Sequence, residues 1–387
     1  MISSDFDGVV LAVPTSFGYA KHSKQSADWF VAQCLKRMLV DAGIEKSDVD
    51  GLAVSSFTMA TNPVASLSRS LGMSLKWLES VPFGGASGIL ALRRAGRAVQ
   101  NGDASIVACI GADSNPRGGF ESLVSRFSMA SEDAVFPYGA AGPSMPFAHM
   151  TRQYMDATGT SREDFGRLCI SQRWNSSKCE HALLRSPISL AEYLEAPAIA
   201  EPLHKLDLVM PCAGADGFLV MSEDAALALR LPYARIRSLV ERHNAFADDQ
   251  RILRGGWARD SDVFYGLSGL RPRDIDVLAT YDDFPVVVFM QLEALGFCEP
   301  GRAAELVRDN DLTINGNLPH NTSGGQLGCG QAGAAGGYLG LVEILRQITH
   351  QASGRQVNGA RIGVVAGYGM AVYDRCLATG IAMLEAA

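Results

Sequence analysis

A glycine-rich turn before an expected helix is the first place where this sequence could do chemistry. Residues 81–103 read VPFGGASGILALRRAGRAVQNGD, the pattern of a strand end, a turn and a helix that would present a reactive side chain. The turn carries no such side chain, because glycine stands at position 85, where a nucleophile is expected. We therefore expect chemistry here to use backbone N–H groups or side chains from other segments.

Other candidates for acid–base chemistry stand beside expected strand ends and turns. Tyr281 follows a strand in TYDDF, and a phenol can act as general acid or base when neighbouring donors stabilise its anion. The alternative is a tyrosine that ends a strand with its hydroxyl in water. Asp282 and Asp283 would either orient Tyr281 or serve a turn or helix cap. Tyr368 in AGYGM either joins the chemistry or narrows a tunnel, and His320 in LPHNTSGG either joins it or is a surface or supporting residue.

An internal duplication indicates which elements position these residues. KSDVDGLAVSSF at residues 46–57 returns as PRDIDVLATYDDF at residues 272–284, and ASIVACIGAD at 104–113 returns as ARIGVVAGYG at 360–369. Between the paired segments, each copy has a glycine-rich turn that leads into a helix, and the second helix has apolar residues spaced by three and four. Strands that alternate with helices, repeated twice, predict an α/β protein of two similar halves.

The two halves are interrupted by a region of different composition. We predict an N-terminal half of residues 1–120 plus 205–248, an inserted region of residues 121–204, and a C-terminal half of residues 249–387. The inserted region is rich in helix-compatible polar residues, aromatic residues and methionine. We interpret it as a helical cover over a substrate tunnel for a bulky apolar group.

Composition excludes several classes of function. The 387-residue chain has a formal net charge of −7 and scattered basic residues, so we predict no nucleic-acid binding. Its apolar runs are too short for a membrane helix, and the N-terminus lacks the basic region of a signal peptide. We therefore expect a soluble, cytoplasmic protein. The eight cysteines form no CxxC pair and the histidines are dispersed, so we predict no metal site and no tightly bound cofactor.

Five segments, in this order along nearly the whole chain, resemble the thiolase superfamily, and in particular its sterol-carrier-protein-type branch. GGASG is similar to the family's CASG helix start, CAGADGFLVMSEDAA to its DGA strand, and YDDFPVVVFMQLEALGFCEPG to its HDCF or NEAF motif. NTSGGQLGCGQAGAAGG is similar to the family's turn with the GHP sequence, and VVAGYGMAV stands at its CxGGGMG segment. The resemblance implies a thiolase-like five-layered αβαβα core, a homodimer and coenzyme A thioesters as substrates.

The resemblance also implies three catalytic side chains that this chain lacks. The acylated cysteine is replaced by Gly85 and the second cysteine by Val365, and the GHP histidine aligns with Gly330 or Gln331. We therefore predict that no covalent acyl-enzyme forms. Cys329, within two residues of the missing histidine, leaves open an acyltransferase that uses another cysteine or a partner's residues; the other interpretation of Cys329 is a small apolar filler.

Backbone groups survive these replacements. In the family an oxyanion hole is built from N–H groups that map to Gly85 and Gly367. Such a hole suits retro-aldol cleavage of a β-hydroxyacyl-CoA, in which negative charge collects on the thioester oxygen. Tyr281, at the position of the family's His or Asn, is then the expected base.

The superfamily's steroid side-chain aldolases are similar in having a tyrosine at the position of Tyr281. They work with a small partner that contains a zinc ribbon and an OB fold, so the resemblance implies such a partner here. They use a second tyrosine in the region where this chain has Gln331, which makes Gln331 a candidate whose side chain departs from their pattern. A non-catalytic acyl-CoA-binding subunit remains a further alternative.

Overall fold

The computed structural model describes residues 5–59, 63–120, 133, 136–139, 142–248, 253–372 and 375–387. Its main sheet is mixed and contains nine strands: β1 (Val9–Ala20), β2 (Gly51–Ser55), β3 (Trp77–Ser80), β4 (Ile106–Asp113), β7 (Ala213–Ser222), β8 (Tyr233–His243), β9 (Val277–Ala279), β10 (Ile362–Ala371) and β11 (Cys376–Ala386). The strand order is β3-β2-β4-β7-β1-β8-β11-β10-β9. A separate two-stranded sheet pairs β5 (Ala198–Ala200) with β6 (Leu203–His204).

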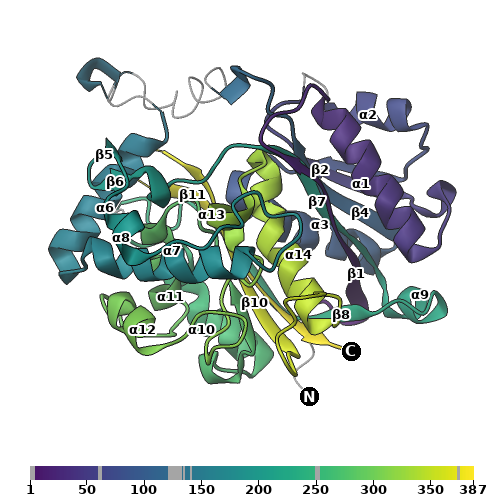
Figure 1. The fold of residues 1–387 in the computed structure, drawn as a ribbon. Coiled ribbons are helices and arrows are strands. Elements are labelled where there is room, and N and C mark those ends of the chain that lie inside the picture. Colours follow the sequence, from purple (N-terminus) through teal and green to yellow (C-terminus); the bar gives the residue numbers. More distant parts are fainter. Residues whose placement is uncertain are drawn as a thin grey trace.

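Two helices lie between the halves of the main sheet and form the central layer. They are α3 (Ser87–Asn101) and α14 (Gly336–Ile348), which pack on each other and on strands of both halves. The outer faces are covered by α1 (Ala27–Ala42) on the N-terminal half and α10 (Trp257–Ser268) on the other. The layers therefore follow the predicted αβαβα sequence, as Figure 1 shows.

The remaining helices are shorter or belong to the cover of the C-terminal half. They are α2 (Pro63–Leu71), α6 (Ser144–Thr158), α7 (Arg162–Ser176), α8 (Leu190–Leu194), α9 (Glu223–Ala228), α11 (Pro285–Ala294), α12 (Ala303–Asp309) and α13 (Gly325–Cys329). Helices α6, α7 and α8 fall in the expected insertion, whose residues 121–132, 134–135 and 140–141 lie outside the described part of the chain. The boundaries of the insertion stay a proposal.

The duplicated sequence segments take equivalent places in the sheet. Strand β2 runs parallel to β4, and β9 runs parallel to β10. In each copy an aspartate just before the first strand holds the start of the second: Asp50 accepts the N–H groups of residues 105 and 106, and Asp276 those of residues 361 and 362. The two segments predicted to correspond are therefore equivalent strands.

The two central helices begin in the same way. Each is preceded by a 3-10 turn, at Gly84–Ala86 before α3 and at Gly333–Ala335 before α14. The first residue of each turn has a left-handed backbone, with φ of 53° at Gly84 and 52° at Gly333, a conformation that glycine adopts without steric cost. Glycine at the first position of each turn is therefore explained by the left-handed backbone that the turn requires.

Strand β8 joins the halves. It forms a short antiparallel ladder with β1 and a longer one with β11. We predicted that this strand completes the first half, and it shares more of its length with the second. The division at residue 248 therefore remains a proposal.

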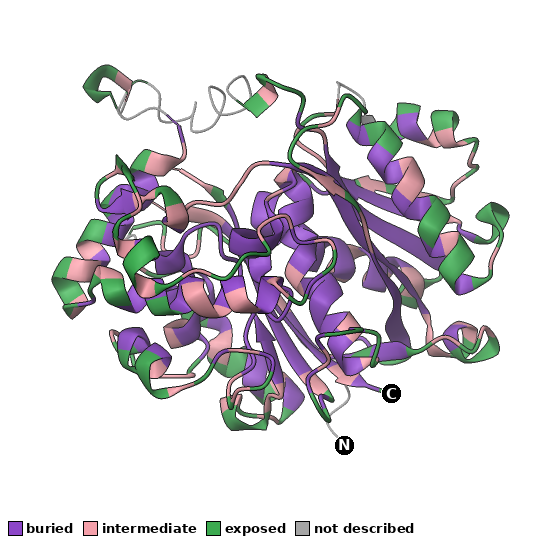
Figure 2. Ribbon diagram, in the orientation of Figure 1, coloured by how far each residue is buried: buried purple, intermediate pink, exposed green. Residues whose placement is uncertain are grey.

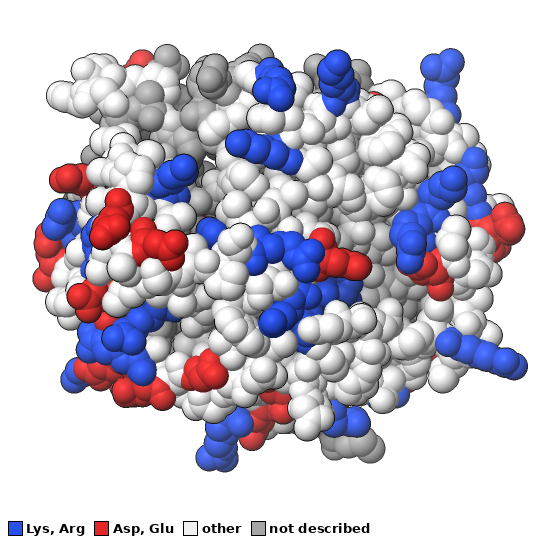
Figure 3. Space-filling view, viewed as in Figure 1, with Lys and Arg blue, Asp and Glu red and all other residues white. Residues whose placement is uncertain are grey.

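Burial follows the layers. Strand β4 is buried along its whole length, as its continuous apolar sequence predicted, and α14 is buried on nearly every side (Figure 2). On the face seen in Figure 3, Lys and Arg are interspersed with Asp and Glu. No helix in the described residues is long and apolar enough to cross a membrane.

Candidate functional site

A cavity opens where the two glycine turns, the end of β10 and the segment after β9 meet. It is lined by backbone and side chains of residues that are far apart in the sequence, among them Gly84, Gly85, Asp113, Phe147, Cys212, Tyr281, Asp283, Phe284, Gln331, Gly333, Tyr368 and Gly369. Three of the predicted site residues, Tyr281, Gln331 and Tyr368, therefore face one space together with Gly85.

Two hydrogen bonds from a neighbouring side chain to the main chain of Tyr281 hold this residue in place. The side chain of Gln291, fully buried on α11, accepts the Tyr281 N–H at 3.0 Å and donates to the Tyr281 carbonyl at 2.7 Å. These two bonds fix the residue just after β9, where the strand has ended and α11 has not yet begun. The ring is consequently aimed across the cavity floor at the start of α3, rather than into water.

The ring of Tyr281 fills the space that a side chain at position 85 would need. A Cβ atom added to Gly85 would lie 2.1 Å from Cε2 of Tyr281 and 2.2 Å from the backbone oxygen of Tyr368. Both distances are far inside van der Waals contact. A side chain at position 85 is therefore excluded twice, by the ring of Tyr281 and by the backbone oxygen of Tyr368.

The hydroxyl of Tyr281 accepts a hydrogen bond. The amide of Gln331 donates to it at 2.9 Å, and Gln326 donates as well. Burial raises the pKa of Tyr281 well above 10, the nearby carboxylates Asp283 and Asp282 raise it further, and the two amide donors oppose this shift. Tyr281 is therefore a phenol near neutral pH. With its oxygen accepting from the amides, its own proton is available to the cavity.

The side chains of Asp282 and Asp283, which follow Tyr281, have different surroundings. Asp282 is turned away and accepts the N–H groups of Gln326 and Leu327, which fixes the start of α13; burial raises its pKa to about 6. Asp283 lines the cavity, and its Oδ1 is buried with no hydrogen-bond partner among the described residues. Burial, followed by the charge of Asp282, raises the pKa of Asp283 well above its usual range.

Tyr368 lines the same cavity and stacks on Tyr281. Its ring lies parallel to that of Tyr281, with centroids 6.4 Å apart, and packs on Trp257 at 5.6 Å. Its hydroxyl finds no protein partner in the part of the chain that the structure describes, and burial raises its pKa. Like Asp283, Tyr368 lines the cavity and has a buried polar atom with no partner among the described residues.

Two of the predicted site residues, His320 and Cys329, do not line the cavity. His320 is fully buried behind β9, where its Nε2 contacts the Thr280 hydroxyl at 2.8 Å, and burial lowers its pKa to about 3. It is neutral there and is not a surface histidine. The thiol of Cys329 points away from the cavity and donates to the carbonyl of Ser323 at 3.3 Å; its hydrogen bond with Cys179 raises its pKa.

The predicted oxyanion donors are placed unequally. Gly85 lines the cavity. Gly367 packs directly against the Gly85 backbone, where an added Cβ would meet the Gly85 oxygen at 2.8 Å, and Gly369, two residues on, reaches the cavity wall instead. Of the two predicted donor residues, Gly85 is therefore the one that lines the cavity, and the donor roles of both N–H groups stay predictions.

Comparison with known proteins decides the family. A model described as "Thiolase C-terminal domain-like" matches residues 239–379. A steroid side-chain-cleaving aldolase of Thermomonospora curvata is 30% identical over 91% of this chain and 93% of its own. This chain belongs to the thiolase superfamily.

Two further relatives place the chain within its superfamily. A 17-hydroxy-3-oxo-4-pregnene-20-carboxyl-CoA lyase of Mycobacterium tuberculosis is 29% identical over 85% of this chain and 88% of its own length. A solved structure titled "Ltp2-ChsH2(DUF35) aldolase" has a TM-score of 0.83 and 28% identity, and covers 98% of each chain. The suspected branch, without the nucleophilic cysteine and similar to steroid side-chain aldolases, is confirmed.

As a thiolase-superfamily site, this cavity contains groups that the sequence analysis did not single out. Phe147 of the expected insertion stacks on Phe284 with ring centroids 4.1 Å apart, which makes one wall aromatic. Cys212 also lines the cavity, and burial raises the pKa of its thiol. Neither could have been found from local spacing. Asp283 was named, but only the structure distinguishes it from its neighbour Asp282.

Proposed function

We propose that this protein is a carbon–carbon lyase that cleaves a β-hydroxyacyl-CoA by a retro-aldol reaction without a covalent acyl-enzyme. The observation that carries the proposal is the phenol of Tyr281, which occupies the space of the missing nucleophile and is held by Gln331 at 2.9 Å. The names of two relatives, an aldolase and a CoA lyase, support the same reaction class.

The reaction needs one proton acceptor, one proton donor and a group that stabilises the enolate. The hydroxyl proton of the substrate leaves, the bond between its α- and β-carbons breaks, and a carbonyl forms at the β-carbon. The electron pair of the broken bond becomes the thioester enolate, whose oxygen is received by the Gly85 N–H and by Gly367 or a neighbouring N–H. A proton then returns to the α-carbon, which releases the shorter acyl-CoA.

Tyr281 is the acid–base residue we propose at the reacting carbons. The sequence led us to expect a base, but a pKa raised by burial means that Tyr281 enters the reaction with its proton. A phenol in that state donates to the enolate carbon, and Gln331 and Gln326 stabilise the phenolate left behind. The burial of Tyr281 therefore favours the donor role over the acceptor role.

Asp283 is the acceptor that this assignment requires. Asp283 lines the cavity and its buried Oδ1 is unpaired within the described residues, so a substrate hydroxyl bound beside this residue would supply the hydrogen bond that the oxygen lacks. A carboxylate whose pKa is raised is also a stronger base than an ordinary aspartate. Tyr368, with its free hydroxyl above the same space, would orient the oxygen that is being deprotonated.

The wall of the cavity supports a bulky apolar acyl group. Phe147, Phe284 and Met370 present carbon and sulfur surface, and Tyr281 and Gln331 place polar groups beside Gly85. This division suits a substrate whose reacting carbons are polar and whose remainder is apolar, such as a steroid side chain. The coenzyme A portion would leave through the open side of the cavity.

We also propose the assembly expected from the sequence. A homodimer is supported by β3, which forms an edge of the main sheet and exposes Leu78. A small zinc-ribbon and OB-fold partner is supported by the solved aldolase, whose title names a DUF35 protein beside the thiolase-like chain. A cytoplasmic location remains part of this proposal.

The function is tested by incubation of the protein with β-hydroxyacyl-CoAs that carry a bulky β-substituent, with and without a DUF35 partner. We expect a ketone or aldehyde and the shortened acyl-CoA in equal amounts, and an unchanged intact protein mass, because Gly85 cannot be acylated. An adduct on Cys329 or Cys212 would favour an acyltransferase instead. Ester binding without turnover, whichever partner is present, would favour a non-catalytic subunit.

Replacement of Asp283 with asparagine tests the proton acceptor. We expect Asp283→Asn to lower the turnover number by about 100-fold, the lower end of what a positioned base contributes. In the wild type the rate should fall as pH falls through the raised pKa of Asp283, because only the carboxylate accepts a proton. The asparagine variant should lack that fall. If it keeps the wild-type pH profile, Asp283 is not the acceptor.

A further inference from the structure

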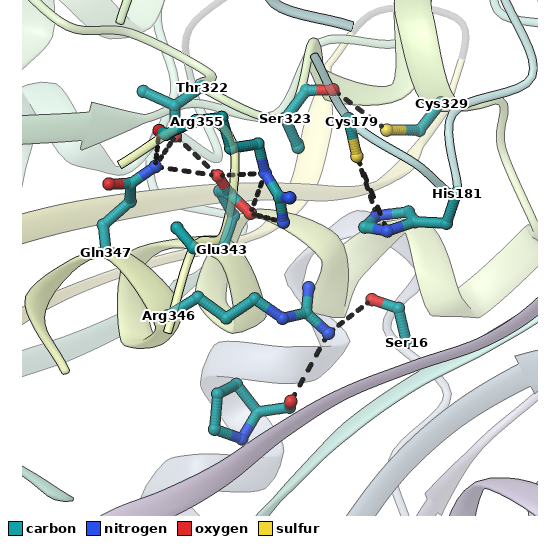
Figure 4. A network of polar contacts seen from close by, with 12 residues as sticks. Ser16, Cys179, His181, Thr322, Ser323, Cys329, Glu343, Arg346, Gln347 and Arg355 are labelled. Carbon is teal, nitrogen blue, oxygen red and sulfur yellow. Dashed lines mark hydrogen bonds and ion pairs between the residues drawn. The ribbon is translucent and has the colours of Figure 1, made fainter. Parts of the chain in front are cut away.

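We propose a metal site for a zinc-class ion, formed by Cys179, His181 and Cys329, that is separate from the cavity. The ligand atoms of these three residues all lie within 4.8 Å of one another. Figure 4 shows the two thiols and the imidazole turned toward one another beneath the segment of Ser323. This differs from the absence of a metal site that the sequence spacing predicted, because Cys329 comes from a distant part of the chain.

The ligand atoms lie close enough together to share one ion once the His181 ring turns to point a single nitrogen at it. The Sγ of Cys179 lies 3.3 Å from Nε2 and 3.5 Å from Nδ1 of His181. Zinc bonds to sulfur and nitrogen place neighbouring ligand atoms roughly 3.4 to 3.8 Å apart in a tetrahedron. Thiolate and imidazole are the ligands that zinc prefers among protein groups. Three protein ligands leave one position for water beside His181, which is only half-buried.

Charges of both signs surround the cluster, where Asp216 and Arg346 accompany a buried ion pair. The ion pair of Arg355 with Glu343 is buried and joined by hydrogen bonds of 2.9 to 3.3 Å, so its two charges cancel locally. Two thiolates and one divalent ion also sum to zero. A neutral cluster is the arrangement that a buried site with this composition tolerates best.

The chemistry of the cluster favours a metal over a reactive thiol. Neither cysteine lines the substrate cavity, and both are fully buried, so an acyl group has no route to them through it. A structural ion needs no such route. The two cysteines would also be close enough for oxidation to a disulfide, and the experiment below separates that outcome from metal binding.

The ion would fix the turn that carries Gln331. Cys329 ends α13, two residues before Gln331, and Cys179 and His181 lie in the loop after α7. The same loop pairs with that turn through two backbone bonds, from the N–H of Leu183 to the carbonyl of Cys329 and from Leu184 to Gly328. A bridge between these segments would hold the Gln331 amide in place against Tyr281.

The test measures metal directly and does not depend on activity. Full-length protein purified without chelators should contain about one zinc per chain by elemental analysis. Protein stripped by chelation and reloaded with Co²⁺ should show a thiolate-to-cobalt charge-transfer band and intense visible bands typical of tetrahedral coordination. This spectrum uses the unaltered chain, so it stays informative even if a variant fails to fold.

Variants locate the site. Cys179→Ser, His181→Ala and Cys329→Ser should each lose most of the metal, whereas Cys298→Ser, a half-buried cysteine outside the cluster, should retain it. Absence of zinc and of the cobalt spectrum, with all thiols reduced, would overturn the proposal. So would a Cys179–Cys329 disulfide in the purified protein if the reduced protein still bound no metal.

Discussion

Tyr281→Phe is expected to lower the turnover number by about 100- to 10,000-fold, the contribution typical of a positioned acid or base. Only the hydroxyl is removed, so the ring still packs over Gly85 and binding of the CoA ester should change little. The measurement is single-turnover release of the ketone or aldehyde from a β-hydroxyacyl-CoA, with any required partner present.

Two other tyrosines serve as controls for this result. Tyr368→Phe also removes a hydroxyl at the cavity, and its effect should be smaller because that hydroxyl orients the substrate and transfers no proton. Tyr338→Phe removes a buried hydroxyl that contacts Ser55 at 2.9 Å, away from the cavity, and should leave turnover close to wild type. A fully active Tyr281→Phe variant would remove Tyr281 from the mechanism.

Gly85→Ala is expected to disable the site without removing any polar side chain. Its new methyl would lie 2.1 Å from the Tyr281 ring and 2.2 Å from the backbone oxygen of Tyr368, so both the ring and the backbone at position 368 must move, by about 1 Å or more. A displacement of this size can cost about 100-fold in turnover. Overpacking of the buried turn should also lower the free energy of unfolding by about 1 to 3 kcal/mol.

Gly85→Cys extends the same test. It restores a thiol at the start of α3, but the added side chain meets the same obstruction and finds neither a histidine at Gln331 nor a cysteine at Val365. We therefore expect no thiolysis. Gly266→Ala on α10 is the matched control, because nothing lies within 4 Å of its added Cβ and its stability should be unchanged or improved. Normal turnover in Gly85→Ala would show that Tyr281 need not stay where it is.

The sequence by itself determined the framework. The repeated segments DVDGLAV and DIDVLAT, the continuous apolar run in β4 and the glycines before α3 and α14 follow from backbone and burial requirements that act over a few residues. These local requirements predicted the two halves and the central helices. The same reasoning found that Gly85 cannot carry an acyl group, because the identity of one residue decides that question.

Only the tertiary structure decided where side chains point. It brought Tyr281 across the missing side chain of Gly85 and the Gln331 amide onto its hydroxyl. It also buried His320 behind β9 and turned Cys329 toward Cys179. Each outcome depends on the packing of segments that are distant in the sequence, and periodicity carries no information about such contacts. The burial that raises the pKa of Tyr281, and so favours a donor over a base, is likewise a property of the assembled fold.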